Sequence, residues 1–388
     1  MAFCLSEANK FFSDVPDRTG TSSLKWEKYS SSDVIPLWVA DMDFKSPPSV
    51  VDLAVEISSR GNFGYGVCPK SLYEIVIQRS SVYYDWSIDK QTIVWLPGMV
   101  CGLNIACKVF QQSASQVLTN TPIYPPFLTA PGYSQLKCTR VPMVVVENQY
   151  EIDFEKLLSL ETKSGDLFML CHPHNPVGRC FSQDELLRLC NFILERDLFV
   201  CSDEIHCDLI LEKGLRHIPF ASLNSEIADR TITLMAPSKT FNLPGFGCSY
   251  AVIPNIKLRN KFRNAMRGIV PDPPAMGFLL AEEAYRNGEK WRIELIKYLR
   301  TNRDLAFSEI SSLPGITPYS PQATYLMWVD ARGLGIENPH SFFEDAGVGL
   351  SNGADFGNSG FLRLNLGCTR SLLEKAIERM KTALVHLS

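Results

Sequence analysis

The chain of 388 residues predicts an α/β protein whose main sheet is mostly parallel. Short apolar segments alternate with amphipathic helices through its middle, and three of these segments end in a polar cluster. Segments 167–170, 198–201 and 231–235 lead to Asn175, Asp203 and Lys239, respectively. Ligands of open α/β sheets bind outside the carboxyl ends of the strands, so these three side chains are expected to meet at one site.

The composition is that of a soluble globular protein with a large core. Hydrophobic residues make up 45% of the chain and charged residues 21%. The net charge of -4 gives no reason to expect a nucleic acid or an anionic membrane as partner. No apolar stretch approaches the roughly 20 residues that span a bilayer. Residues 1–7 lack the basic and apolar regions of a signal peptide, so we expect a cytoplasmic protein.

The 12 cysteines are scattered, mostly in apolar contexts, and none forms a CxxC pair. Such cysteines are typical of buried, reduced thiols in a cytosolic protein. We therefore expect neither a disulfide framework nor a metal site.

Local signals place several elements along the chain. Residues 92–95 are predicted to form an apolar strand, after which Pro97-Gly98 offers a glycine-permitted tight turn into a helix over 99–110. Ser182-Gln183-Asp184-Glu185 is a capping box that predicts a helix running to about Arg196.

The C-terminal part has a different pattern, with three prolines between 314 and 321 and a glycine-rich turn at 353–360. Residues 371–374 are predicted to be a second capping box, and the helix they begin carries one apolar face: Leu373, Ile377, Met380 and Leu384. These patterns predict two domains. A large domain would span 48–285, and residues 1–47 and 286–388 would form a smaller one.

Lys239 carries the clearest chemical signal, because a lysine at the end of a buried strand is costly unless its amine is used or its charge is paired. A buried lysine shifts its pKa readily and can form a Schiff base. Together with Asp203 and Asn175 it matches the needs of pyridoxal phosphate. The lysine would bond the aldehyde, the aspartate would keep the ring nitrogen protonated, and the asparagine would donate to the phenolate oxygen. Residue spacing alone also allows three ordinary polar groups at strand ends.

Further residues suit a phosphate, a flat ring and a carboxylate. Met99 and Val100 open a helix whose N-terminus is a potential anion site, and Ser238 adds a hydroxyl. Tyr124 could stack on a ring, although a tyrosine flanked by proline is often plain packing. Arg363, in the alternating strand 361–365, could bind the carboxylate of an amino acid or could be a solvated strand residue.

Several segments resemble a known family. Residues 173–178, 202–204 and 238–240 resemble the signature segments of fold-type I pyridoxal phosphate (PLP) enzymes, the class I/II aminotransferase family. Four segments are similar to those of the MalY/PatB group of cystathionine β-lyase-like C–S lyases: 18–26, 38–44, 63–66 and 238–243. The resemblance extends from about residue 18 to about residue 370. It implies an αβα large domain with a mostly parallel sheet and a smaller α+β domain.

The resemblance also implies roles for individual residues. Lys239 would be the Schiff-base lysine and general base, Asp203 the partner of the ring nitrogen and Tyr124 the stacking aromatic. Further cofactor contacts would come from Asn175, Met99, Val100, Ser238 and His206. Arg363 and the Ala40 backbone would bind the substrate carboxylate, and Tyr65 would reach the phosphate or substrate of the other subunit in a homodimer.

The chain departs from many aminotransferases at two positions. His206 stands where they often carry tyrosine. A histidine at this position is similar to the C–S lyase group. Gly247 stands where classical members often place an arginine for the phosphate. Segment 271–275 also differs from the usual family pattern and is expected to line the substrate entrance.

The resemblance predicts β-elimination from cystathionine or another cysteine S-conjugate, giving a thiol, pyruvate and ammonia. A PLP-dependent aminotransferase shares the early chemistry and is the first alternative. The second, of another class, is a PLP-binding regulatory protein that contacts a transcription factor, although no DNA-binding helix-turn-helix is evident.

Overall fold

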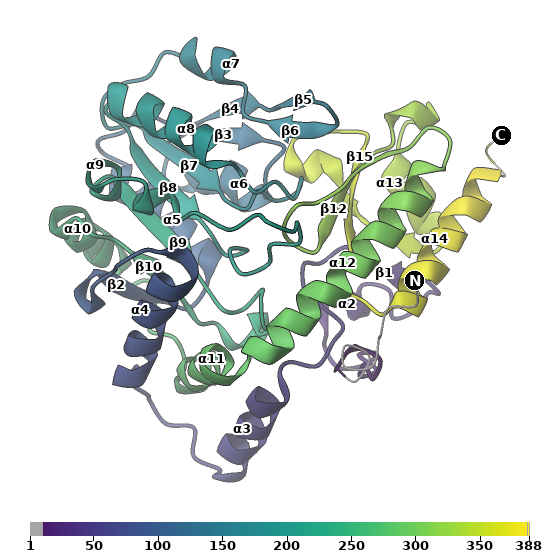
Figure 1. Ribbon diagram of the computed structural model, residues 1–388, viewed down its shortest axis with the longest axis horizontal. Helices are drawn as coiled ribbons and strands as arrows, with labels where there is room; N and C mark the ends of the chain where they lie inside the picture. Colours follow the sequence, from purple (N-terminus) through teal and green to yellow (C-terminus); the bar gives the residue numbers. More distant parts are fainter. Residues whose placement is uncertain (1–10, 386, 388) are drawn as a thin grey trace.

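A seven-stranded sheet forms the centre of the larger part of the computed structural model, which describes residues 11–385 and 387 (Figure 1). The strands, in spatial order, are β2 (Ile93–Leu96), β10 (Ser249–Val252), β9 (Thr231–Met235), β8 (Phe199–Asp203), β7 (Leu167–Cys171), β3 (Gln116–Thr121) and β4 (Lys137–Pro142). Strand β10 is antiparallel to both neighbours, whereas the other pairs are parallel. The predicted α/β class with a mostly parallel sheet is confirmed.

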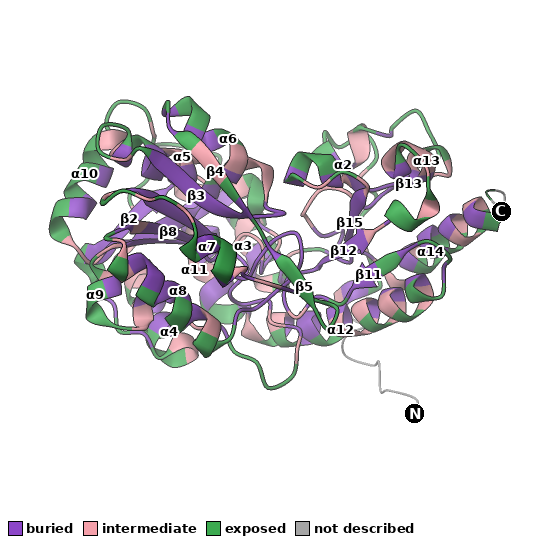
Figure 2. Ribbon diagram, turned by 90° about the horizontal axis from the view of Figure 1, so that it is seen from above, coloured by how far each residue is buried: buried purple, intermediate pink, exposed green. Residues whose placement is uncertain are grey.

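Helices cover both faces of this sheet, which explains why its central strands are apolar without interruption. Helices α5 (Met99–Phe110), α6 (Pro125–Tyr133) and α10 (Ile256–Met266) share a core with one face, to which Met169 and Cys201 contribute. Helices α7 (Phe154–Leu158), α8 (Gln183–Glu195) and α9 (Ser225–Ala228) lie with the other face, to which Leu170 and Val200 contribute. The strands are buried accordingly (Figure 2).

The N-termini of two helices test the two predicted capping boxes. Helix α8 begins at the predicted capping box, where Ser182 Oγ accepts from Glu185 N at 3.2 Å and Glu185 Oε2 accepts from Ser182 N at 2.8 Å. The second predicted capping box is wrong. Helix α14 (Arg370–Val385) starts before Ser371, and Thr369 Oγ1 caps it by accepting from Leu372 N at 3.3 Å. Ser371 lies inside the first turn, which is too late for a cap.

The predicted apolar face of α14 is buried. It packs in the smaller part of the molecule, which holds a four-stranded sheet in the order β11 (Thr317–Tyr319), β12 (Leu326–Asp330), β15 (Phe361–Asn365) and β14 (Ser351–Asn352). Strand β1 (Ile35–Pro36) pairs in parallel with β13 (Val348–Gly349), so the N-terminal region joins this part. The two sheets draw on separate stretches of chain, while the domain limits at 48 and 285 stay a prediction.

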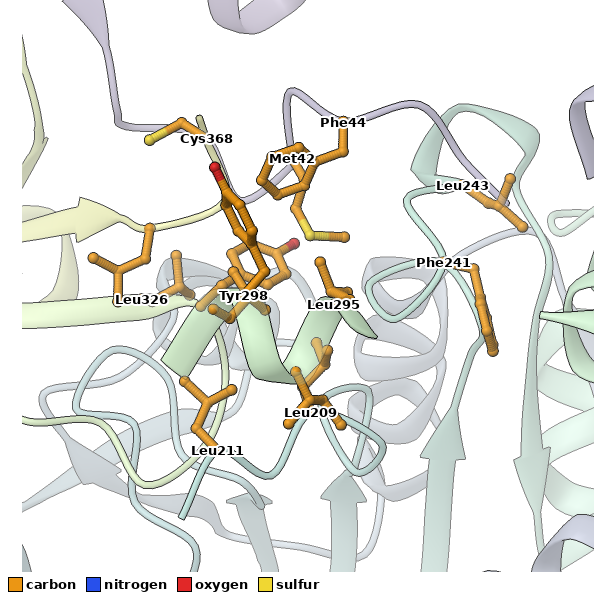
Figure 3. Close-up of a cluster of buried hydrophobic side chains, with 14 of the residues drawn as sticks. Met42, Phe44, Leu209, Leu211, Phe241, Leu243, Leu295, Tyr298, Leu326 and Cys368 are labelled. Atoms are coloured by element: carbon orange, nitrogen blue, oxygen red, sulfur yellow. The ribbon is translucent and has the colours of Figure 1, made fainter. Parts of the chain in front are cut away.

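The long helix α12 (Glu289–Ser311) runs from the larger to the smaller part (Figure 1). Its Leu295 and Tyr298 lie against Met42 and Phe44 of the N-terminal region (Figure 3), and the rings of Phe44 and Tyr298 are 5.3 Å apart. Asn302 of the same helix donates to the carbonyl oxygens of Leu366 and Cys368. One continuous core therefore holds both parts and the N-terminal region together.

The remaining helices are α2 (Leu24–Glu27), α3 (Pro48–Ser59), α4 (Lys70–Tyr84), α11 (Ala275–Asn287) and α13 (Pro339–Asp345). Two further strands, β5 (Val144–Val146) and β6 (Gln149–Glu151), form a separate hairpin. Within residues 11–385 and 387, no helix is long and apolar enough to cross a membrane. The described cysteines are free thiols, and most of them are buried.

Gly178 should be intolerant of a side chain. Its φ of +70° is left-handed, and a Cβ there would overlap the Pro321 side chain and lie 2.8 Å from Pro321 Cα. Gly214 has a similar φ of +84° but open space around the Cβ position. Both alanine variants should lose about 1 kcal/mol to backbone strain, and Gly178→Ala should lose about 1–3 kcal/mol more to overlap. Thermal unfolding of the two variants measures this difference, and equal losses would contradict it.

Candidate active site

A cavity of about 630 Å³ lies at the carboxyl ends of the central strands and is lined from both sheets. Ten of the predicted site residues line it: Lys239, Asp203, Asn175, Tyr124, Met99, Val100, Ser238, His206, Arg363 and Ala40. Tyr65 does not. It is fully exposed on the segment between α3 and α4.

The amine of Lys239 lies inside the cavity, on the turn that follows β9. Its Nζ donates to the carbonyl oxygen of Ala40 at 2.5 Å. Burial, together with the nearby charge of Arg363, lowers the pKa of Lys239 to about 8, while Asp41 and Asp203 act in the opposite direction. A larger share of the amine is therefore neutral near physiological pH than for an ordinary lysine, and a nucleophile or base requires the neutral form.

Asp203 ends β8 and points into the same cavity, with 3% of its surface exposed. Its Oδ1 accepts from the backbone N–H of Ile205 at 3.1 Å, but no lysine or arginine among the described residues forms a salt bridge with it. Burial raises the pKa of Asp203 to about 7, opposed by the Ile205 N–H. Such a carboxylate lacks a cation and would gain from a positively charged N–H in the cavity.

Arg363 is another cation that lines the cavity, and only 5% of its surface is exposed. Its guanidinium donates to Asn175 Oδ1 at 3.0 Å, to the Trp38 carbonyl oxygen at 2.9 Å and to Ser351 Oγ at 3.2 Å. Burial lowers its pKa to about 10. No carboxylate among the described residues pairs with it, so this cation is available to a carboxylate ligand.

Asn175 gains a definite orientation from this contact. Because Arg363 has only donors, it must face the amide oxygen of Asn175. The amide nitrogen is then free to donate elsewhere, and Asn175 lines the cavity. The cavity therefore contains a free amide donor, while its role toward a phenolate oxygen stays a prediction.

The segment 38–44, here called the entry segment, lines the cavity with Trp38, Val39 and Ala40, and side chains from elsewhere hold it by hydrogen bonds to its carbonyl groups. Asn365 Nδ2 donates to the carbonyl oxygens of Val39 and Asp41, both at 2.6 Å. Asn242 Nδ2 donates to those of Met42 and Phe44. The Ala40 carbonyl, which accepts from Lys239, also accepts from the hydroxyl of Tyr325 at 2.8 Å. Both parts of the molecule thus fix the backbone that faces the lysine.

The N-terminus of α5 forms the far end of the cavity, where Gly98, Met99 and Val100 lie. Gly98 directly precedes the helix as predicted, but its φ of 174° is extended backbone that any residue adopts, so the turn does not use the conformational freedom of glycine. Gly98 instead leaves open space beside the first helical N–H groups, with no atom within 4 Å of a Cβ position. Those N–H groups have no partner within the helix and attract an anion.

Gly247 also lines this end and explains the missing arginine. Its φ of +58° is left-handed, and a Cβ there would lie 2.8 Å from the carbonyl oxygen of Pro97. A side chain is therefore excluded at this position. An anion here would depend on backbone N–H groups and hydroxyls such as that of Ser238.

Sequence reasoning missed several residues of the site. Segment 271–275 is not among the residues that line the cavity, and its place at a substrate entrance stays a prediction. Tyr325, Ser351 and Asn365 hold the entry segment or Arg363, and none of them was foreseen. Only Asn365 carried a signal, since it lies two residues after Arg363 in the same strand and so shares its side of the sheet.

The cavity defines a class of protein. An amine, a carboxylate without a cation, a free amide donor and an open helix N-terminus converge at the carboxyl ends of parallel strands, and these groups fit the aldehyde, ring nitrogen, phenolate oxygen and phosphate of PLP. This is the site of a fold-type I PLP enzyme.

Comparisons with known proteins agree with this class. Residues 32–380 match the family "Aminotransferase class I and II". The chain is 36% identical to cystathionine β-lyase PatB of Bacillus subtilis, over 95% of this chain and 98% of PatB. The crystal structure of OvoB matches with a TM-score of 0.93 at 42% identity, covering 96% of this chain and 98% of OvoB. PLP-containing cystalysin from Treponema denticola matches with a TM-score of 0.91 at 31% identity, covering 97% and 99%.

The chain therefore belongs to the class I and II aminotransferase family, and within it to the PatB/MalY cystathionine β-lyase-like group. Its cofactor is pyridoxal 5′-phosphate. The predicted family, fold and cofactor are confirmed.

The pKa of Lys239 can be measured in the apoprotein. An acylating reagent attacks only the neutral amine, so labelling of Lys239 should rise with pH and reach half its maximum near pH 8, well below the value of about 10.4 for an ordinary lysine. Mass spectrometry of the labelled peptide reports this. Arg363→Gln should move the midpoint upward, because it removes a neighbouring positive charge. A midpoint near that of surface lysines would contradict the shift.

Proposed function

We propose that this protein is a cytoplasmic PLP-dependent C–S β-lyase, which converts cystathionine or another cysteine S-conjugate into a thiol, pyruvate and ammonia. The observation that carries the proposal is that one cavity holds both the Lys239 amine, whose pKa is lowered to about 8, and the Arg363 guanidinium, which has no carboxylate partner among the described residues. The guanidinium can bind the carboxylate of a substrate, and the amine can take a proton from the carbon next to that carboxylate. Similarity to PatB, a cystathionine β-lyase, supports the reaction class.

Substrate binding would use Arg363 as the carboxylate clamp, with the Ala40 backbone beside it. The guanidinium is already oriented by Asn175, Trp38 and Ser351, so it need not reorganise. Its ring contact with Phe356, 4.6 Å from the centroid, closes the other side. An amino acid held there would present its α-carbon to the region of Lys239.

Lys239 would act as the general base. When bound, PLP supplies an electron-withdrawing ring that stabilises negative charge at the α-carbon. The Lys239 amine, with a pKa of about 8, can remove the α-proton, and the Ala40 carbonyl accepts from the ammonium that results. Tyr325 holds that carbonyl in place.

The other residues would bind and orient the cofactor. Asp203 would face the ring nitrogen, Asn175 would donate to the phenolate oxygen and Tyr124 would stack on the ring. Met99, Val100 and Ser238 would hold the phosphate from the α5 N-terminus. His206 would remain a neutral contact, because burial and the charges of Lys239 and Arg363 lower its pKa to about 3.

We further propose a homodimer in which Tyr65 enters the partner's cavity. Phe63, Tyr65 and Val67 are highly exposed on the segment between α3 and α4, and Val55 of α3 is exposed as well. The segment is held against the molecule at Gly66, where a Cβ would lie 2.8 Å from Ala275 Cα. An apolar surface of this kind is typical of an interface.

A substrate panel tests the reaction. The holoenzyme should form pyruvate and thiol from cystathionine or a related cysteine thioether, and Lys239→Ala should lower turnover by about 10³-fold or more because the base is lost. Lys45→Ala, a lysine outside the cavity, serves as control and should keep full activity. Release of keto acid without thiol or pyruvate would identify an aminotransferase instead.

Mixed dimers test the role of Tyr65. Tyr65→Ala and Lys239→Ala proteins should each be impaired. Mixing equal amounts under exchange conditions should restore about a quarter of wild-type activity, since half of the dimers would contain one intact site. A mixture no more active than its parents would refute the shared site.

A further inference from the structure

A second polar cluster lies on the face of the sheet opposite the cavity. Side chains alternate along a strand, so Asp203 faces the cavity and the next residue, Glu204, faces the side of α8. Glu204 is completely buried there, together with His172 and His217. None of these three residues lines the cavity.

The Glu204 carboxylate has three polar contacts, and two of them are with donors. Oε1 accepts from Ser202 Oγ at 2.7 Å and from the backbone N–H of Phe220 at 3.0 Å. Oε2 lies 2.6 Å from Nε2 of His217. When Nε2 of His217 carries a proton, both carboxylate oxygens accept, which is the hydrogen-bond pattern of an ionised carboxylate. In this arrangement of the His217 ring, Glu204 is charged.

Little else in the cluster offsets this charge. His217 is the only described residue with a titratable basic group within ion-pair distance of Glu204. The His172 ring lies 4.6 Å from that of His217, but burial keeps its pKa well below the usual value, so it remains neutral. Burial also lowers the pKa of His174 to about 4. Among the described residues no group suited to a metal ion is found, so the cluster has no such alternative use.

The position of Glu204 gives this charge a consequence. It is bonded to Asp203 through one peptide unit, and its charge favours a proton at Asp203. Charges act strongly over such distances when water is excluded. Its hydrogen bonds also tie segment 217–220 to the end of β8. The carboxylate of Asp203 thus has a buried negative charge and a rigid support behind it.

We propose that Glu204 is a positioning residue for Asp203, and that its buried charge, acting across the sheet, strengthens the hold of Asp203 on the protonated ring nitrogen of PLP. The inference rests on the proposed role of Asp203 and extends it to residues outside the cavity. It assigns His217 as the group that orients the Glu204 carboxylate.

The experiment compares two cofactors bound to the apoprotein. One is PLP, and the other is its analogue in which C–H replaces the ring nitrogen, so that Asp203 has no proton to hold. Dissociation constants are measured by fluorescence quenching. Glu204→Gln keeps the shape and removes the charge, and it should reduce the preference for PLP over the analogue by at least about threefold.

Asp208→Asn is the matched control for general damage. Asp208 is also a buried carboxylate on the same loop, held by Arg79 at 3.0 Å and by Tyr84 at 2.6 Å, but it does not line the cavity. It should lower thermal stability and leave the cofactor preference unchanged. A preference that falls equally in Glu204→Gln and Asp208→Asn would overturn the inference.

Two further variants separate the possible failures. Asp203→Asn should abolish the preference. If Asp203→Asn keeps the preference for PLP, the proposed role of Asp203 fails. If Asp203→Asn loses the preference but Glu204→Gln retains it, only the present inference fails. His217→Gln keeps the Glu204 charge and a donor to it, and should retain the preference. If Glu204→Gln does not fold, His217→Gln still tests the inference. A threefold fall in its preference for PLP over the analogue would overturn the role of the Glu204 charge.

Discussion

The parallel hydrogen-bonded register of β7, β8 and β9 is the constraint on which the site depends. It aligns Cys171 with Asp203, and Asp203 with Leu234. A slip of one residue would exchange the two faces of β8, turning Asp203 toward α8 and Glu204 into the cavity. Because helices cover both faces, such a slip would also expose or bury the wrong side chains throughout the strand. The register that builds the core therefore also selects the carboxylate that meets the ligand.

The cavity contains charges that the protein alone does not neutralise. Lys239, Asp203 and Arg363 are each shifted from their ordinary pKa values by burial, and none has an ion-pair partner among the described residues. Such groups are costly to bury. Carbonyl and amide groups reduce that cost without removing the charge, and the large surrounding cores offset the rest. A cofactor and an amino acid are the natural complement of this arrangement.

The entry segment shows that the site belongs to both parts of the molecule. Asn242 holds it from the region after β9, whereas Asn365 and Arg363 hold it from β15. Phe44, at its end, packs on α12 within the continuous core. Movement of one part relative to the other would shift the Ala40 carbonyl away from Lys239. Catalytic geometry and the packing between the two sheets are therefore linked.

The sequence by itself determined the class of sheet, the helices α5 and α8, and the candidates Lys239, Asp203, Asn175 and Arg363. These follow from signals that act over a few residues: an apolar run, a cap, a polar group at a strand end. Whole-chain resemblance added the family and its cofactor. A solvated Arg363, which the alternating strand allowed, is excluded because β15 is buried.

Only the tertiary structure decided which distant groups hold these residues. Tyr325 lies 285 positions from Ala40, and Asn365 lies 326 from Val39, so no local pattern could pair them. The cap of α14 and the open space at Gly98 likewise depend on how neighbouring backbone is placed. The face on which Glu204 lies is decided by the register of the sheet. Chain contacts of this range are set by packing, which a sequence pattern does not encode directly.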